Sequence, residues 1–453
     1  MRERASKATH LPRRAILGGT AALAASAITH RASAAPSDGG GLGTPEAPVS
    51  IRMIANDAFA KMWQTVLIPE FNKLYPHIKV TIDGAPYAEQ LTKTLLDLTG
   101  ANPNYDVICT DDPWTPQLAQ AGALLDIRKE AAAWTDPHFD WEDFYAAPLA
   151  ASEWKGVQYG VPLRSNMMLM FYNRTHYRKA GLPEPTPKLT WTEYMAQAPK
   201  LVQDLKGDGK INAWAIDTYF ARDQLTPTVW QTILNAHGGK LLDENGKAAF
   251  NTKEGVAALQ LFVDLLKYAP PGAKSHIFNE ELQAFRQNQL ATMFMWGSVY
   301  RGVAVDPTIT TLKPEDVGVQ VMPVGSVRAG THRGIWSGVI SKRTSHPAAA
   351  WRLLQWMSSK EGERFSANVT GGFPARKSTL STQPDNAWLL PVFTTLKQAY
   401  ETAEAGQMWR PRLAKSDAVQ QILADEVALA TAGDNSAEEA LKRAAARIDR
   451  LRL

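Results

Sequence analysis

Two stretches of alternating apolar and polar residues constrain the fold of this chain more than any other feature. Val49, Ile51 and Met53 alternate with polar residues, and Ile78, Val80 and Ile82 repeat the pattern. Between them, residues 57–74 carry apolar side chains at helical spacing. A strand, a helix and a second strand in this order form a parallel pair, because the helix carries the chain back along the sheet. The sequence therefore predicts an α/β fold with a parallel sheet.

Several further strand-like runs end in residues that are suited to ligand binding. Residues 105–109 precede Asp111 and Asp112, the apolar run Ala291–Met295 stops at Trp296, and Trp336 stands among small residues near the start of another run. Ligands bind beyond the carboxyl ends of strands in open α/β sheets. We therefore interpret these residues as candidates for a binding site. Core packing of the tryptophans and helix N-capping by Asp112 are the structural alternatives.

Composition limits the size class and the partners of this protein. The chain has 453 residues, which predicts two or more domains, and its 45% hydrophobic and 21% charged residues are typical of a soluble globular protein. Residues 1–34 hold six Lys or Arg and one acidic residue, which leaves 43 basic against 44 acidic residues in the remainder. No basic field therefore favours nucleic acid as a partner. The single cysteine, Cys109, excludes an intramolecular disulfide.

The first 34 residues have the pattern of an export signal. Arg13 and Arg14 directly precede a weakly apolar stretch, Ala15–Ile28, which is too short to span a bilayer. An A-x-A cleavage pattern follows at Ala32–Ala34. The paired arginines favour the twin-arginine route over the general secretory route, although Pro12 and Ile16 depart from the usual twin-arginine pattern. We expect residues 1–34 to be a signal cleaved near Ala34, residues 35–48 to be a flexible leader, and the protein to be periplasmic.

Neither a metal nor another cofactor is expected from the sequence. The nine histidines are scattered without metal-ligand spacing. Residues 204–209 partly match a calcium loop, but Lys206 takes the third ligand position and Ala215 the twelfth, where a bidentate Glu is required. A plain turn is the better interpretation of this segment.

Six stretches in order along the chain carry a resemblance to a known family. They are the strand before Asp111 with residues 119–122 behind it, Tyr159–Pro162, Tyr172–Asn173, Met293–Trp296, Gly371–Arg376, and the closing helices from Ser416. Together these stretches resemble the family 1 extracellular solute-binding proteins of ABC importers, the carbohydrate-binding, maltose-binding-protein-like group. The resemblance covers essentially the whole chain after residue 48.

This resemblance implies the two-lobed periplasmic-binding-protein fold of type II, with interleaved α/β lobes joined by hinge segments around a ligand cleft. It places an N-terminal lobe at residues 49–166 plus 320–372 and a C-terminal lobe at residues 167–319 plus 373–453. The crossings between lobes are expected near residues 164–170, 317–322 and 371–377. It also implies a monomer that delivers a mono- or oligosaccharide, or a sugar derivative, to the membrane permease subunits of an ABC importer.

Sugars offer hydroxyls that need paired hydrogen bonds and C–H faces that stack on aromatic rings. Carboxylates, guanidinium groups and tryptophans in a cleft therefore suit a carbohydrate. For Arg376, which matches the family's Gly-x-Pro-x-Arg turn, the alternative is an ion pair, and for Arg164 it is hinge packing. The candidate ligand-binding residues are Asp111, Asp112, Arg164, Trp296, Trp336 and Arg376, followed by Asn56, Asp57, Tyr87, Trp114, Tyr219 and Trp409.

Two other classes of protein compete with this interpretation. An exported glycoside hydrolase needs two carboxylates that face each other, whereas Asp111 and Asp112 are adjacent and their side chains diverge. The sequence also has no H-E-x-x-H and no G-x-S-x-G motif, and we therefore do not expect an enzyme. A binding protein for a phosphodiester, a sulfonate or a polyamine stays open, because Arg164 and Arg376 could hold an anionic group.

Overall fold

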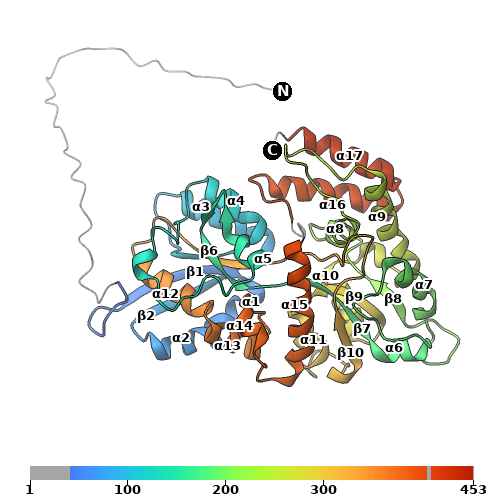
Figure 1. Cartoon of the computed structure of the whole chain (residues 1–453), viewed down its shortest axis with the longest axis horizontal. Coiled ribbons are helices and arrows are strands. Elements are labelled where there is room, and N and C mark those ends of the chain that lie inside the picture. Colours follow the sequence, from blue (N-terminus) through green and yellow to red (C-terminus); the bar gives the residue numbers. More distant parts are fainter. Residues whose placement is uncertain (1–40, 406–409, 452–453) are drawn as a thin grey trace, which may run out of the picture. The chain divides into compact units, whose positions relative to one another are not determined.

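Two β-sheets, each covered by helices, organise the fold (Figure 1). The structure is a computed structural model of the chain and describes residues 41–405 and 410–451. These residues belong to one compact unit that extends from residue 38 to residue 453. The predicted export signal, the first part of the predicted leader and Trp409 lie outside the described residues.

The first sheet has five strands in the order β2-β1-β3-β11-β6. Strands β1, β2 and β3 are parallel, and β11 runs antiparallel between β3 and β6. The predicted parallel strand–helix–strand unit is therefore confirmed, with Val49 opposite Ile78 and Asn56 opposite Ala85. The strands of this sheet are β1 (Val49–Asn56), β2 (Ile78–Ala85), β3 (Val107–Asp111), β6 (Gly160–Arg164) and β11 (Trp336–Ile340).

The second sheet has four strands in the order β10-β7-β9-β8. Strand β8 is parallel to β9, while β7 is antiparallel to both β9 and β10. Every residue of β7 is buried, and so is every residue of β9 except its last, Trp296. The strands of this sheet are β7 (Met168–Asn173), β8 (Trp214–Asp217), β9 (Leu290–Trp296) and β10 (Val317–Gln320).

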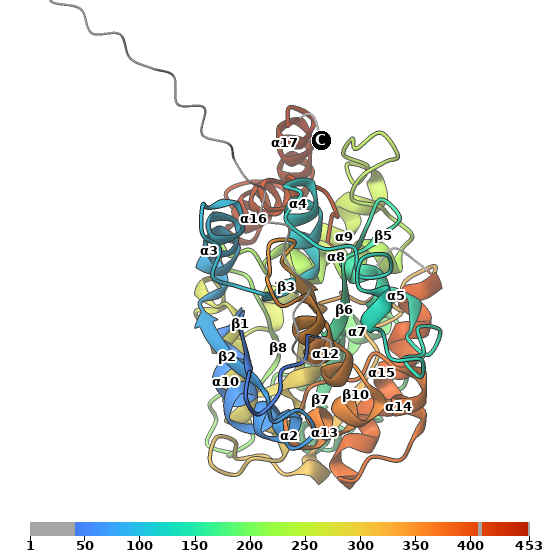
Figure 2. The same cartoon turned by 90° about the vertical axis from the view of Figure 1, so that its left-hand side faces the viewer.

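Amphipathic helices cover both sheets and bury their apolar sides against them. Helix α12 packs on strands β1, β6 and β11, and Figure 2 shows it beside the strands of the first sheet. Helices α7, α10 and α15 pack on the second sheet. The helices of the first group are α1 (Asp57–Met62), α2 (Ile68–Leu74), α3 (Tyr87–Thr99), α4 (Thr115–Gln120), α5 (Ala146–Leu149), α12 (Pro347–Met357) and α13 (Lys360–Thr370). Those that follow or cover the second sheet are α6 (Arg174–Lys179), α7 (Trp191–Leu201), α8 (Pro227–Ala236), α9 (Lys253–Asp264), α10 (Phe278–Arg286), α11 (Tyr300–Ala304), α14 (Lys377–Ser381), α15 (Leu390–Ala405), α16 (Ser416–Ala432) and α17 (Ala437–Asp449).

Local signals in the sequence fix several element boundaries. Thr190 and Glu193 form a capping box at the start of α7, and Ser436 accepts a hydrogen bond from the backbone of Glu439 at the start of α17. Strands β4 (Glu153–Trp154) and β5 (Val157–Gln158) form a short hairpin. Lys155 and Gly156 both have positive φ, as a two-residue hairpin turn of type I′ requires.

The chain passes between the two sheets more than once, so each sheet is assembled from distant segments. It leaves the first sheet after Arg164 and enters the second at Met168, where the first crossing was predicted. The second predicted crossing, at residues 317–322, begins instead with a strand of the second sheet. Strand β10 pairs with β7 there, and the chain reaches the first sheet only at Trp336. Val317, Val319 and Val321 are apolar at every second position, which is the pattern of a strand, whereas the resemblance had placed a crossing there.

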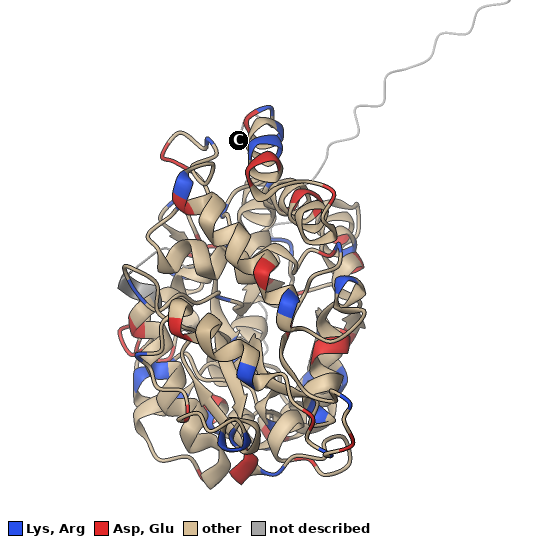
Figure 3. Ribbon diagram, turned by 90° about the vertical axis from the view of Figure 1, so that its right-hand side faces the viewer, with Lys and Arg blue, Asp and Glu red and all other residues tan. Residues whose placement is uncertain are grey.

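Charged residues of both signs are interspersed along the chain. Figure 3 shows Lys and Arg in blue and Asp and Glu in red, scattered over the helices and loops on the side that faces the viewer. Among the described residues, no helix has the length and apolarity needed to cross a membrane. The same residues hold no group of three or more His, Cys, Asp and Glu arranged to bind a metal ion.

Candidate functional site

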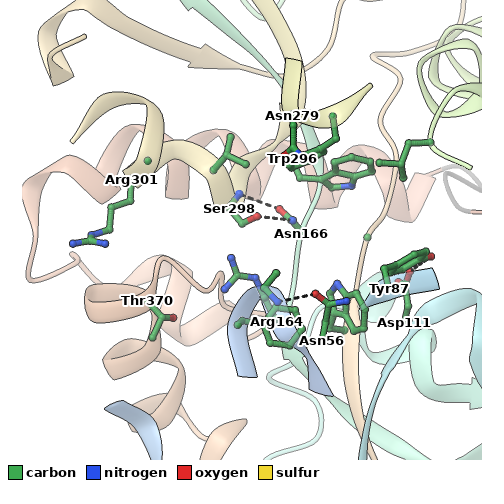
Figure 4. A pocket seen from close by; sticks show the side chains of 18 of the residues that line it. Asn56, Tyr87, Asp111, Arg164, Asn166, Asn279, Trp296, Ser298, Arg301 and Thr370 are labelled. Atoms are coloured by element: carbon green, nitrogen blue, oxygen red, sulfur yellow. Dashed lines mark hydrogen bonds between the residues drawn. The ribbon is translucent and has the colours of Figure 1, made fainter. Parts of the chain in front are cut away.

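A cavity of about 600 Å³ opens where the strands of the two sheets end. Asn56, Asp111 and Arg164 stand at the carboxyl ends of β1, β3 and β6, and Trp336 opens the antiparallel strand β11. All four therefore lie at the same edge of the first sheet. Trp296 closes β9 of the second sheet and lines the same cavity (Figure 4).

The strand register of the first sheet places three of these side chains in one row. Trp336 is paired with Asp111 on one side and with Arg164 on the other. The register shifts between Trp336 and Ser337, where the sheet is irregular. An aromatic ring thus has a carboxylate on one side and a guanidinium on the other. These are the three types of side-chain group that suit the binding of a carbohydrate.

One wall of the cavity is a cluster of aromatic rings from the first sheet and its helices. The ring of Trp336 meets those of Phe59 and Tyr87 edge-on, with centroids 5.2 and 6.0 Å away. Trp114 packs behind them, 5.6 Å from Trp336 and 4.9 Å from Tyr87, and is 4% exposed. Trp336 and Tyr87 are only half-buried and line the cavity, whereas Trp114 supports them from the core.

The opposite wall is built on Trp296. Its ring stacks on Tyr219, with centroids 6.0 Å apart and 20° between the planes, and lies against Phe278. Tyr219 is fully buried, so it backs the tryptophan and does not line the cavity. Gly334 passes so close that a Cβ there would stand 2.7 Å from Nε1 of Trp296. Trp296 is therefore held from behind and half-exposed in front, as an aromatic platform requires.

Arginines bind the two adjacent aspartates. Arg410 donates through Nη2 to Asp111 Oδ1 at 2.6 Å and to Asp112 Oδ1 at 3.3 Å. It also donates to the hydroxyl of Tyr87 at 3.1 Å, and that hydroxyl donates to Asp111 Oδ2 at 2.8 Å. Fully buried Arg333 donates to Asp112 Oδ2 at 2.9 Å. Burial alone would lower the pKa of Arg410, but Asp111, Tyr87 and Asp112 raise it well above its ordinary value, so it stays charged.

A brace of hydrogen bonds joins the first connection between the sheets to the turn after β9. The Asn166 amide donates to Ser298 Oγ at 2.8 Å and accepts from the Ser298 backbone N–H at 3.1 Å, as Figure 4 shows. The backbone oxygen of Asn166 in turn accepts a hydrogen bond from the backbone N–H of Gly334. Three chain segments thus meet at one side of the cavity.

Six of the twelve residues proposed from the sequence line this cavity, and five described ones do not. Asp112 lies behind Asp111 and serves Arg333 and Arg410. Asp57 is the exposed first residue of α1. Trp114 and Tyr219 back the two aromatic walls. The residues that line the cavity are Asn56, Tyr87, Asp111, Arg164, Trp296 and Trp336.

Arg376 is the clearest correction. Its guanidinium donates to the backbone oxygens of Ser358 and Asp140, both at 2.6 Å, and lies 3.9 Å from the ring centroid of Phe144. It is 3% exposed, and its nearest carboxylate is Asp143, at 3.4 Å. Arg376 therefore forms an ion pair, which is the alternative to ligand binding named for it above. It fixes the segment at residues 371–377 to Ser358 and to the loop that contains Asp140 and Asp143.

Other residues of the cavity were missed in the sequence. Arg410, Phe59 and Phe278 lie in loops or helices whose patterns also fit ordinary packing. Asn166 and Ser298 each lie two positions from a predicted residue but carry no motif of their own. The only signal for Arg410 was its position next to Trp409, which had been proposed.

Comparison with known proteins agrees with this geometry. Residues 57–364 match the family of bacterial extracellular solute-binding proteins, more than half of the chain. The chain belongs to this family. This solute-binding protein has the type II, MalE-like periplasmic-binding-protein fold: it superposes on the maltose-bound MalE3 protein of T. maritima with a TM-score of 0.77 at 24% identity, covering 89% of this chain and all of the other.

Two further relatives are slightly more similar in sequence. An ABC transporter solute-binding protein from Agrobacterium radiobacter, solved in complex with ribitol, is 26% identical with a TM-score of 0.74, over 89% of this chain and 98% of that one. A probable amino-acid ABC transporter periplasmic-binding protein of Sinorhizobium fredii is 27% identical over 65% of each chain. The match thus spans slightly less than two thirds of that relative.

Proposed function

We propose that this protein binds a carbohydrate or polyol between its two halves and delivers it to the permease of an ABC importer. The observation that carries the proposal is the cavity with two aromatic walls, Trp296 on one side and Trp336 with Tyr87 on the other, and polar groups between them. Its volume, about 600 Å³, lies in the range usual for small-molecule sites. Relatives solved with maltose and with ribitol support this ligand class.

We also propose that the halves built on the two sheets are lobes that close on the ligand. A ligand favours the closed state only through contacts that it makes in that state alone. The extent of closure therefore depends on how much more tightly the closed state binds the ligand than the open state does. The protein acts as a monomer and, in this proposal, performs no chemistry on its ligand. The described lining of the cavity contains two carboxylates, Asp111 and Asp306, and each is paired with an arginine. Asp111 accepts a hydrogen bond from Arg410, and Asp306 lies 3.9 Å from Arg301. These two carboxylates are therefore not available as the acid and base pair of a hydrolase.

A thermal-shift panel of the purified protein tests the ligand class. The panel contains sugars, polyols and amino acids. A compound that binds the folded protein, present at about 100 times its dissociation constant, raises the free energy of unfolding by about 2.7 kcal/mol. We expect a rise in melting temperature with members of the sugar and polyol set. Stabilisation by amino acids alone would reject the carbohydrate, and conversion of a bound glycoside into products, detected by chromatography, would replace transport by hydrolysis.

An amino acid is the second candidate ligand, since the Sinorhizobium fredii relative is named for one. An amino acid brings an ammonium group that needs an anionic partner when it is buried. Both acidic residues of the cavity, Asp111 and Asp306, already have arginine partners. This charge distribution favours the carbohydrate.

Export by the twin-arginine route is proposed from Arg13 and Arg14 alone. Replacing both by lysine should leave precursor in the cytoplasm, measured by fractionation and immunoblotting. Normal periplasmic accumulation of that variant would assign the protein to the general secretory route.

A further inference from the structure

Arg164 differs from the buried arginines of this protein, because it is half-buried and lines the cavity. Arg333, Arg376 and Arg410 each have a carboxylate oxygen close by, at 2.9, 3.4 and 2.6 Å respectively. Among the described residues, the guanidinium of Arg164 has neither a hydrogen bond nor an ion pair, and its Nη1 is buried without a partner. The guanidinium carbon lies over the ring of Phe59, 5.6 Å from the ring centroid.

The surroundings of Arg164 make this cation costly. Burial lowers the pKa of Arg164 to about 10, and the thiol of Cys109 opposes this shift only in part. Taking a guanidinium partly out of water without a hydrogen-bonded counter-ion is unfavourable. A neutral donor such as Asn would contact sugar hydroxyls from the same place without this cost. The charge itself therefore needs a partner, and the described protein does not supply it.

The cavity has an excess of positive charge around Arg164. Its lining contains four arginines and two aspartates. Arg410 is neutralised by Asp111, and Arg301 lies near Asp306, whereas Arg286 donates to the backbone oxygen of Gly302. In Figure 4 the head group of Arg164 points into the space between Ser298 and Thr370, with Arg301 along the same side. An anion in this space would meet cations from both sheets.

We propose that the ligand is an acidic sugar, whose single anionic group is held by Arg164. This inference rests on the proposed function and narrows it from carbohydrates in general to those that carry a carboxylate, a phosphate or a sulfonate. A carboxylate accepts two parallel hydrogen bonds from the guanidinium fork. The hydroxyls of the same ligand meet Asn56 and Asn166, and its C–H faces meet Trp296 and Trp336.

Calorimetric titration with matched pairs of ligands tests this proposal. The probes are D-glucuronate against D-glucose, D-galacturonate against D-galactose, and glucose 6-phosphate as the phosphate arm, each at low and high salt. A hydrogen bond to a charged group is worth about 1.5–3 kcal/mol, so the acidic member should bind about 10- to 100-fold more tightly. High salt should reduce this preference. Whichever binds more tightly, the uronates or glucose 6-phosphate, shows whether the anionic group is a carboxylate or a phosphate.

Two variants locate the effect. Arg164→Gln should abolish the preference for the acidic member and should melt no lower than the wild type without ligand, because it removes a desolvated charge. Arg222→Gln is the matched control: Arg222 is 66% exposed, pairs with Asp425, and does not line the cavity, so the preference should remain.

The outcomes separate the two levels of inference. Equal or tighter binding of the neutral members overturns the acidic sugar and leaves the carbohydrate function standing. A preference for the acidic member that survives Arg164→Gln also overturns the role of Arg164. If neither acidic nor neutral sugars bind, and the thermal-shift panel shows no sugar or polyol, the inference and the proposed function fall together.

Discussion

At the scale of single residues, Trp296 combines a structural and a binding role. Its ring stacks on buried Tyr219 and exposes its other side to the cavity. We expect Trp296→Ala to lower ligand affinity by about 1–3 kcal/mol, roughly 5- to 150-fold, because a sugar face loses its aromatic platform. Some stability is lost as well, since the packed side of the ring is removed.

Calorimetric binding and ligand-free melting, measured on the same variant, separate the two roles. Trp191→Ala is the control, because Trp191 is 1% exposed, packs in the core, and does not line the cavity. It should lose stability with unchanged affinity of the folded fraction. If Trp296→Ala behaves in the same way, Trp296 is a core residue and the platform lies elsewhere.

Glu363 gives a prediction about pH. It is 5% exposed and accepts hydrogen bonds from the backbone N–H groups of Ala375 and Arg376, so it anchors the turn that carries Arg376. Burial raises the pKa of Glu363 from 4.5 to about 7, although these hydrogen bonds and Arg376 oppose the shift. The folded protein therefore holds a proton that the unfolded chain has released.

Stability must then fall as the pH rises from about 4.5 to about 7 and stay level above, with a total on the order of 3 kcal/mol from this group. Glu363→Gln should melt lower overall, because one backbone donor loses its acceptor, but it should lack this pH dependence. Urea unfolding at pH 5 and pH 8 measures the difference. An unchanged slope in the variant would assign the pH dependence to other groups.

At the scale of secondary-structure elements, the sequence predicted what periodicity can carry. The strand–helix–strand unit and the buried run at β9 follow from short-range patterns, and the structure confirms them. Asp111, Arg164 and Trp336 meet in one row because strand ends share a sheet edge. Arg410 could not be predicted in this way, since it lies in a loop and reaches Asp111 only through the tertiary fold.

Arg376 shows the limit of motifs. Residues 371–376 connect helices α13 and α14, and the guanidinium of Arg376 donates to Ser358 and Asp140 and does not line the cavity. A sequence motif fixes the backbone turn more strongly than the direction of one long side chain, because that direction depends on partners far along the chain.

The segment leading into β11 supports a prediction at the same scale. An alanine at position 334 would place its Cβ 2.7 Å from Trp296 Nε1, and the ring cannot retreat because Tyr219 lies behind it. Gly334→Ala should therefore push Trp296 into the cavity and weaken binding several-fold, with about 1–3 kcal/mol of lost stability from overpacking. The double variant Gly334→Ala/Trp296→Phe relieves the contact and should recover stability relative to Gly334→Ala. Full additivity of the two substitutions would mean that the residues do not interact.

At the scale of the whole molecule, Arg410 joins parts of the chain that belong to different sheets. It follows α15, which packs on the second sheet, and its guanidinium binds Asp111 and Asp112 beside the first. Removing one member of a buried ion pair typically costs about 3–5 kcal/mol. Part of that cost is avoided if the two halves move apart and water reaches the aspartates, so Arg410 should bias the protein toward closure.

Small-angle scattering tests this bias. The wild-type protein should have a smaller radius of gyration with saturating ligand than without it, as hinge closure requires. Arg410→Gln should enlarge the ligand-free protein, because the tie to Asp111 is lost, and its affinity should fall since part of the binding free energy is used to close a more open population. Arg222→Gln again serves as the control for the loss of one positive charge. Identical ligand-free scattering of Arg410→Gln and the wild type would show that Arg410 only supports the ligand, and equal radii of the wild type with and without ligand would reject closure itself.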